Sequence, residues 1–204
     1  MSDVTDLAEI TARVLAKFHQ QPGEEPSEDT KERAARVAER VQEQQWAVWD
    51  ACGVPSRLQG ADLSGEDVRP TAALDAVREY LLDEFDEGSA YIHGRALVLA
   101  GPTGVGKSWA AAAALRHAIR QRMANFSRPF VVFRYFPAVV GQLLDPVQRQ
   151  DTLALMKDTR FVVVDDLGVE YVKDGGRVEA FVDEIIWHRE AESLEGRPDA
   201  HDHA

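Results

Sequence analysis

Apolar residues recur at the three- and four-residue spacing of amphipathic helices along most of this chain. The spacing predicts helices over residues 5–19, 30–51, 71–85, 107–124 and 177–194, with Thr71 as an N-terminal cap. Residues 137–158 fit a helix that is broken near Asp145-Pro146. In the last helix the pattern predicts inward-facing residues, with Trp187 beside them: Val178, Phe181, Ile185 and Ile186.

Three short apolar runs have the length and composition of buried strands. They are Ala96–Ala100, Phe130–Phe133 and Phe161–Val164. The first leads into a glycine-rich turn, and the third ends in carboxylates. Polar stretches rich in turn-forming residues separate the elements at 20–29 and 52–70, which we interpret as a linker and an extended connector.

The glycine-rich turn is Gly101-Pro102-Thr103-Gly104-Val105-Gly106-Lys107-Ser108, and Trp109 opens the helix that follows. A strand, a G-x-x-x-x-G-K-S turn and a helix are the context in which backbone N–H groups surround a polyphosphate. Glycines let the backbone approach closely, Lys107 reaches the outer phosphates, and the Ser108 hydroxyl is a magnesium ligand. A chance match in an ordinary Gly/Pro turn is the alternative. We predict that residues 101–109 bind ATP.

The third predicted strand ends in Asp165-Asp166-Leu167-Gly168. Alone, an apolar strand that ends in two aspartates is often a solvated turn. In a chain with a phosphate loop, the first acid, Asp165, is expected to hold the magnesium shell together with Ser108. The second acid, Asp166, is a candidate for orienting or deprotonating the attacking water. Lys107 and Asp166 are therefore the predicted catalytic residues.

Charge and cysteine content limit the classes of protein to which this chain can belong. The net charge is −12 over 204 residues, and residues 1–94 hold 20 acidic and 9 basic side chains, against 15 and 14 in residues 95–204. An acidic N-terminal half is a poor surface for nucleic-acid phosphates and fits a protein partner or simple solubility. Cys52 is the sole cysteine, which excludes a disulfide framework and a cysteine zinc site. No signal peptide or membrane span is evident, and we expect a cytoplasmic protein.

These features divide the chain into four parts: a helical arm at 1–51 with its linker at 20–29, a connector and helix at 52–94, an ATPase core at 95–195, and a tail at 196–204. Trp46 and Trp49 near the end of the arm predict docking onto an apolar surface, either this protein's own core or a partner. In the tail, His201 and His203 flank Asp202, and we interpret them as a solvated end rather than a metal site.

Three stretches together resemble the DnaC-type replicative helicase loaders and the related IstB-type transposition helper ATPases. They are Cys52–Leu63, the phosphate loop, and Val164–Glu170 with the helix that carries Phe181, Ile185, Ile186 and Arg189. The resemblance spans roughly residues 45–195. It implies an α/β fold of the AAA+ P-loop type, with a parallel sheet flanked by helices and an N-terminal arm that engages a ring helicase or a transposase. ATP and Mg²⁺ are the implied cofactors, and DNA is reached through the complex.

The chain also departs from that family. The family places a strand with a polar sensor after the Arg189 helix, and a later helix supplies an arginine to a neighbouring subunit. Here the chain reads Arg197-Pro198-Asp199 and stops soon after. We therefore expect an incomplete core that lacks its last strands and lid, hydrolyses ATP weakly, and is prone to self-association.

The predicted function is ATP-dependent remodelling of a protein–DNA complex in DNA replication. A transposition helper, a nucleotide-gated adaptor without turnover, and a non-functional relic remain as alternatives. A small-molecule kinase is disfavoured, because no lid-like insertion with clustered arginines follows residue 108.

Overall fold

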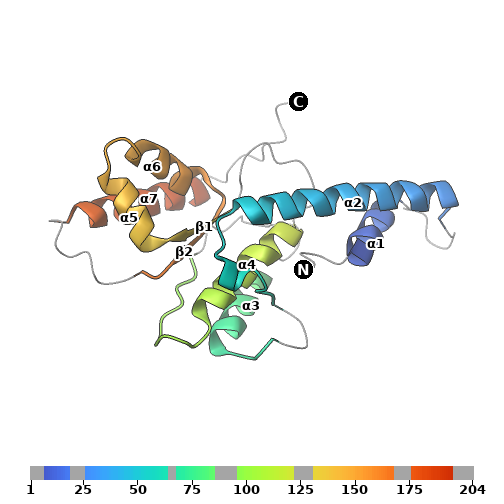
Figure 1. The fold of residues 1–204 in the computed structure, drawn as a ribbon, viewed down its shortest axis with the longest axis horizontal. Helices are drawn as coiled ribbons and strands as arrows, with labels where there is room; N and C mark the ends of the chain where they lie inside the picture. The colour runs from blue at the N-terminus through green and yellow to red at the C-terminus, as the bar shows by residue number, and fades with distance from the viewer. Residues whose placement is uncertain are drawn as a thin grey trace.

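The computed structural model describes residues 7–18, 26–63, 68–85, 96–121, 131–167 and 176–194, and is mostly helical (Figure 1). Its elements, in chain order, are α1 (Leu7–Phe18), α2 (Glu28–Ala51), the short 3₁₀ helix η1 (Ser56–Leu58), α3 (Ala72–Phe85), α4 (Lys107–Gln121), β1 (Val131–Tyr135), α5 (Phe136–Leu144), α6 (Arg149–Asp158), β2 (Phe161–Asp165) and α7 (Arg177–Leu194). The α/β class is confirmed, with helices on both faces of a small parallel sheet.

Strands β1 and β2 pair in parallel, with Val131 opposite Phe161 and Tyr135 opposite Asp165. Their carboxyl ends therefore lie at the same edge of the sheet. The prediction of a strand at Ala96–Ala100 is wrong: these residues form no strand, and Val98 is 76% exposed. An apolar run becomes a strand only when a neighbouring backbone completes its hydrogen bonds, and no described segment pairs with residues 96–100.

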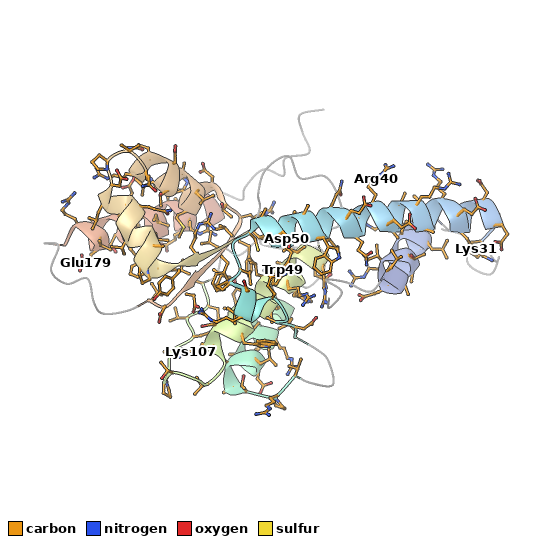
Figure 2. All side chains as sticks on the ribbon, viewed as in Figure 1. Lys31, Arg40, Trp49, Asp50, Lys107 and Glu179 are labelled. Atoms are coloured by element: carbon orange, nitrogen blue, oxygen red, sulfur yellow. The ribbon has the colours of Figure 1, made fainter. Side chains whose placement is uncertain are left out.

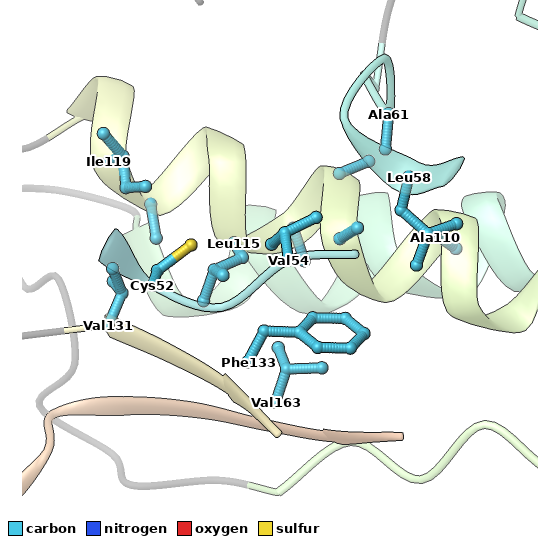
Figure 3. Packing of buried hydrophobic residues seen from close by; sticks show 14 of the residues in the cluster. Cys52, Val54, Leu58, Ala61, Ala110, Leu115, Ile119, Val131, Phe133 and Val163 are labelled. Carbon is cyan, nitrogen blue, oxygen red and sulfur yellow. The ribbon is translucent and has the colours of Figure 1, made fainter. Parts of the chain in front are cut away.

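The two faces of the sheet pack against different helices. Val131, Phe133 and Val163 belong to the core beneath α4, where Figure 3 shows them pointing toward the α4 residues Leu115 and Ile119. Val162 and Val164 pack on the opposite face, against side chains from α5, α6 and α7. The alternation along β2 follows from the two-residue period of a strand. The result is a sheet covered on both faces, as parallel sheets generally are.

Helix α4 lies close to the sheet because its inner residues are small. The alanines at positions 110, 112, 113, 114 and 118 are all buried, and Leu115 is fully buried between them. Alanine is also the strongest helix former, so packing and local preference agree in this segment. This matters for function, because α4 begins at Lys107 and so carries the end of the glycine-rich turn.

The C-terminal end of α2 is part of the main core. Trp49 is fully buried there, and its Nε1 donates a hydrogen bond of 2.6 Å to Gln59 Oε1. Trp46 is partly buried against the same core. The sequence left open whether these tryptophans dock on a partner; Trp49 packs on this protein's own core. The N-terminal part of α2 packs against α1 through a separate cluster, which consists of Ile10, Val14, Ala34, Ala38 and Val41.

The predicted helices are largely confirmed, including the break at Asp145 and the Thr71 cap, whose Oγ1 accepts a hydrogen bond from Leu74 N. In α7, Val178 and Ile185 are buried, but the inward position predicted for Ile186 is wrong, because that side chain is 55% exposed. Trp187 is exposed as well. Residues 195–204 and most of the predicted linker lie outside the described residues. Among the described helices, none combines the length and apolarity needed to cross a bilayer.

Candidate phosphate-binding site

The turn between residues 101 and 107 has the backbone of an anion cradle. Gly101, Gly104 and Gly106 have φ values of 145°, 84° and 88°, a region that other residues rarely adopt. A Cβ at Gly104 would meet no atom within 4 Å, so the tip of the turn is open. A Cβ at Gly106 would contact Thr71 at 3.5 Å, which places the start of α3 against the turn.

Helix α4 directs its N-terminal end at this turn. Ala110 N donates to Gly106 O at 2.9 Å, which closes the first turn of the helix. The N–H groups that precede Ala110 have no carbonyl partner within the helix, and they carry its positive dipole end. Such N–H groups, beside a glycine backbone, suit an anionic ligand such as a phosphate.

Lys107 is held across the mouth of the turn. Its Nζ donates hydrogen bonds to Gly101 O at 2.8 Å and to Pro102 O at 2.7 Å. An ammonium group has three donors, so two fix its position and one is left for a ligand. This arrangement places a positive charge beside the N–H groups of the turn before any ligand arrives.

Ser108 and Asp165 are 57 residues apart in sequence and meet in the structure. Ser108 Oγ donates a hydrogen bond of 2.8 Å to Asp165 Oδ1 at the carboxyl end of β2. A hydroxyl and a carboxylate are hard oxygen ligands, and Mg²⁺ is usually held by one or two carboxylates together with substrate phosphates and water. The described residues contain no group of three or more His, Cys, Asp or Glu side chains able to hold a metal ion by themselves. The pair therefore fits a magnesium ion that arrives with a phosphate ligand.

Asp166 follows at the end of β2 in an unusual conformation. Its φ is 61°, and within the described ranges it is the non-glycine residue found with positive φ. Aspartate tolerates this left-handed conformation better than most residues, although at a cost in energy. Strained residues of this kind concentrate at functional sites. Its side chain is exposed beside Asp165, where the sequence predicted a catalytic base.

A pocket of about 230 Å³ lies next to the two aspartates. It is lined by residues from the connector and from both strand ends: Gly53, Pro55, Arg57, Phe133, Tyr135, Asp165 and Asp166. The connector is attached to β1 by a hydrogen bond of 2.8 Å from Phe133 N to Cys52 O. Sequence reasoning missed Arg57 and Tyr135, because nothing in a linear pattern shows that residues 52–58 lie against β1.

The remaining predicted residues of the turn, Thr103 and Val105, are exposed near its tip. Trp109 is half-buried and packs against the core, and a Cβ at Gly60 would lie 3.6 Å from its Cη2 atom. Its ring therefore faces the connector, and only its backbone N–H belongs to the helix end beside the turn. Figure 2 marks Lys107 at this end of α4, well separated from Arg40 on α2.

Comparison of the chain with protein-family models, curated proteins and solved structures finds no match.

Proposed function

We propose that this protein binds ATP together with Mg²⁺ at residues 101–108 and Asp165. The observation that carries the proposal is the hydrogen bond between Ser108 and Asp165, which joins a glycine-rich anion cradle to an acidic strand end. A chance Gly/Pro turn would have no reason to meet a carboxylate 57 residues away. The lysine anchored across the turn supplies the charge that a polyphosphate requires.

In this proposal, different residues bind different parts of the ATP and its metal ion. The N–H groups of the turn and of the start of α4 surround the inner phosphates. The third N–H of the Lys107 ammonium group donates a hydrogen bond to an outer phosphate oxygen. Asp165 and Ser108 hold the metal shell, and bound Mg²⁺ would neutralise part of the phosphate charge. In this proposal Asp166, exposed at the end of β2, accepts a proton from an attacking water.

On the sequence resemblance alone, we further propose that ATP binding acts on a protein–DNA complex, in the manner of helicase loaders or transposition helpers. A nucleotide-gated adaptor that binds ATP without turnover is the second candidate. A phosphate-release assay separates the two, because only the first releases phosphate in a manner that depends on Lys107. The partner contact is proposed to lie on the N-terminal arm, with Trp49 excluded as an anchor because it is fully buried.

The binding proposal is tested by equilibrium titration of the full chain with ATP in magnesium. Wild-type protein is expected to bind, and Lys107→Ala is expected to lose at least tenfold in affinity, because one charge-assisted hydrogen bond is worth about 1.5–3 kcal/mol. Circular dichroism of both proteins controls for folding. Equal affinity in two equally folded proteins would show that the turn is not the ATP site.

A further inference from the structure

Arg57 is an exposed cation that lines the pocket together with two carboxylates, Asp165 and Asp166. It is the basic residue among those that line the pocket. Among the described residues, Arg57 forms no hydrogen bond, ion pair or ring contact. A guanidinium that is already paired must break its bonds to bind a ligand. Within the part of the chain that the structure describes, Arg57 has no such bonds to break.

The backbone that carries Arg57 is firmly held. The next residue, Leu58, is buried in the core, and its N–H donates to Pro55 O at 2.8 Å to close η1. The side chain of Gln59 joins this segment to α2 and to the loop before η1. Its Oε1 accepts a hydrogen bond from Trp49 Nε1 at 2.6 Å, and its Nε2 donates one to Val54 O at 3.1 Å. The backbone of Arg57 is therefore fixed to the core on both sides of the residue.

The pocket and the phosphate-binding turn share one residue. Asp165 lines the pocket and also accepts the hydrogen bond from Ser108. A triphosphate held by Lys107 and Ser108 would therefore present its outermost phosphate near the pocket side of Asp165. Mg²⁺ held at Asp165 would offset part of the repulsion between these carboxylates and a phosphate, and a positively charged side chain would offset more of it. Arginine is the side chain best suited to the task, because its planar fork matches phosphate oxygens in a two-point contact.

We propose that Arg57 recognises the outermost phosphate of the bound nucleotide, so that the protein distinguishes a triphosphate from a diphosphate through a residue of its own connector. The inference rests on the proposed function.

The test compares the affinities of wild-type protein and four variants for two ligands in magnesium: ADP, and a non-hydrolysable ATP analogue with a β,γ-imido bridge. Arg57→Ala should weaken the analogue about tenfold or more and change ADP affinity less than about twofold, since one charge-assisted contact is lost. Arg57→Lys should lie between, because it keeps the charge and loses the fork. Arg40→Ala, an exposed arginine on α2 with no described partner, is the matched control and should change neither.

Equal effects of Arg57→Ala on both ligands, or no effect on either, would overturn the inference. A lower unfolding midpoint of Arg57→Ala, without a change in the ratio of its affinities for the ATP analogue and ADP, would also overturn it. That result would indicate that Arg57 has a structural role. Lys107→Ala distinguishes a failure of the ATP-binding proposal from a failure of the role proposed for Arg57. If Lys107→Ala abolishes binding while Arg57→Ala leaves selectivity intact, ATP binding stands and the inference fails. If wild-type protein binds neither ligand, both fail.

Discussion

Replacement of Gly53 by alanine tests how the connector is held against the sheet. Gly53 has φ +91°, and an added Cβ would lie 2.8 Å from Arg134 Nη1 and 2.9 Å from Phe133 O. The left-handed backbone costs an alanine about 1–2 kcal/mol. The arginine end can move aside, but Phe133 O belongs to β1, so relief requires the connector to shift away from the strand.

That shift would strain the hydrogen bond between Phe133 N and Cys52 O. Overpacking of this kind typically costs a further 1–3 kcal/mol or so, which brings the expected loss for Gly53→Ala to about 2–5 kcal/mol. Gly176 provides the matched control, since its φ is +81° and its Cβ would meet nothing within 4 Å. Gly176→Ala should therefore lose only the backbone contribution of about 1–2 kcal/mol.

Urea unfolding followed by tryptophan fluorescence measures both variants, and buried Trp49 makes the signal sensitive to the core. The reasoning predicts a clearly larger loss of unfolding free energy for Gly53→Ala than for Gly176→Ala. Equal losses would mean that the connector does not lie against β1 as described, and the pocket beside Asp165 would lose its wall.

Two further predictions concern the metal pair and the buried thiol. Asp165→Asn should remove most of the enhancement of ATP binding by Mg²⁺ while sparing binding in a chelator; equal enhancement in both proteins would exclude Asp165 from the metal shell. Cys52 is 3% exposed, and burial raises the pKa of its thiol from 9.0 to about 11. The folded state then keeps a proton that the unfolded state releases, so the unfolding free energy should fall between pH 9 and 11, by about 2–3 kcal/mol more than in Cys52→Ala. Parallel pH profiles for the two proteins would contradict this.

The helices and two strands could be predicted because their apolar spacing is strong and local. Phe161–Val164 is a good example, since a short run of β-branched and aromatic residues between polar ends favours a buried strand. The proximity of Ser108 and Asp165 could be predicted as well, because a phosphate loop and an acidic strand end are expected to share one ligand. The hydrogen bond of 2.8 Å between them shows that the two residues meet.

Two of the failures depend on contacts between distant segments, and the third is a matter of helix rotation. Residues 96–100 have the composition of a strand, but no described backbone pairs with them. Ile186 follows buried Ile185 by one residue, which is about 100° of helix rotation, and so lies on the exposed side. Arg57 escaped notice because its place in the pocket depends on the attachment of Cys52 to β1.

The central claim, that ATP binds at residues 101–108 beside Asp165, is tested most directly by amide hydrogen exchange with and without ATP and Mg²⁺. The N–H groups from Gly104 to Trp109 are expected to be slowed by the ligand, because they donate to its phosphates. Exchange in α1 and the first half of α2 should be unchanged and serves as the internal reference. Protection centred on residues 101–109 in wild-type protein, absent in Lys107→Ala, is the predicted result. Protection elsewhere with none in the turn, or no protection at saturating ATP, would contradict the account.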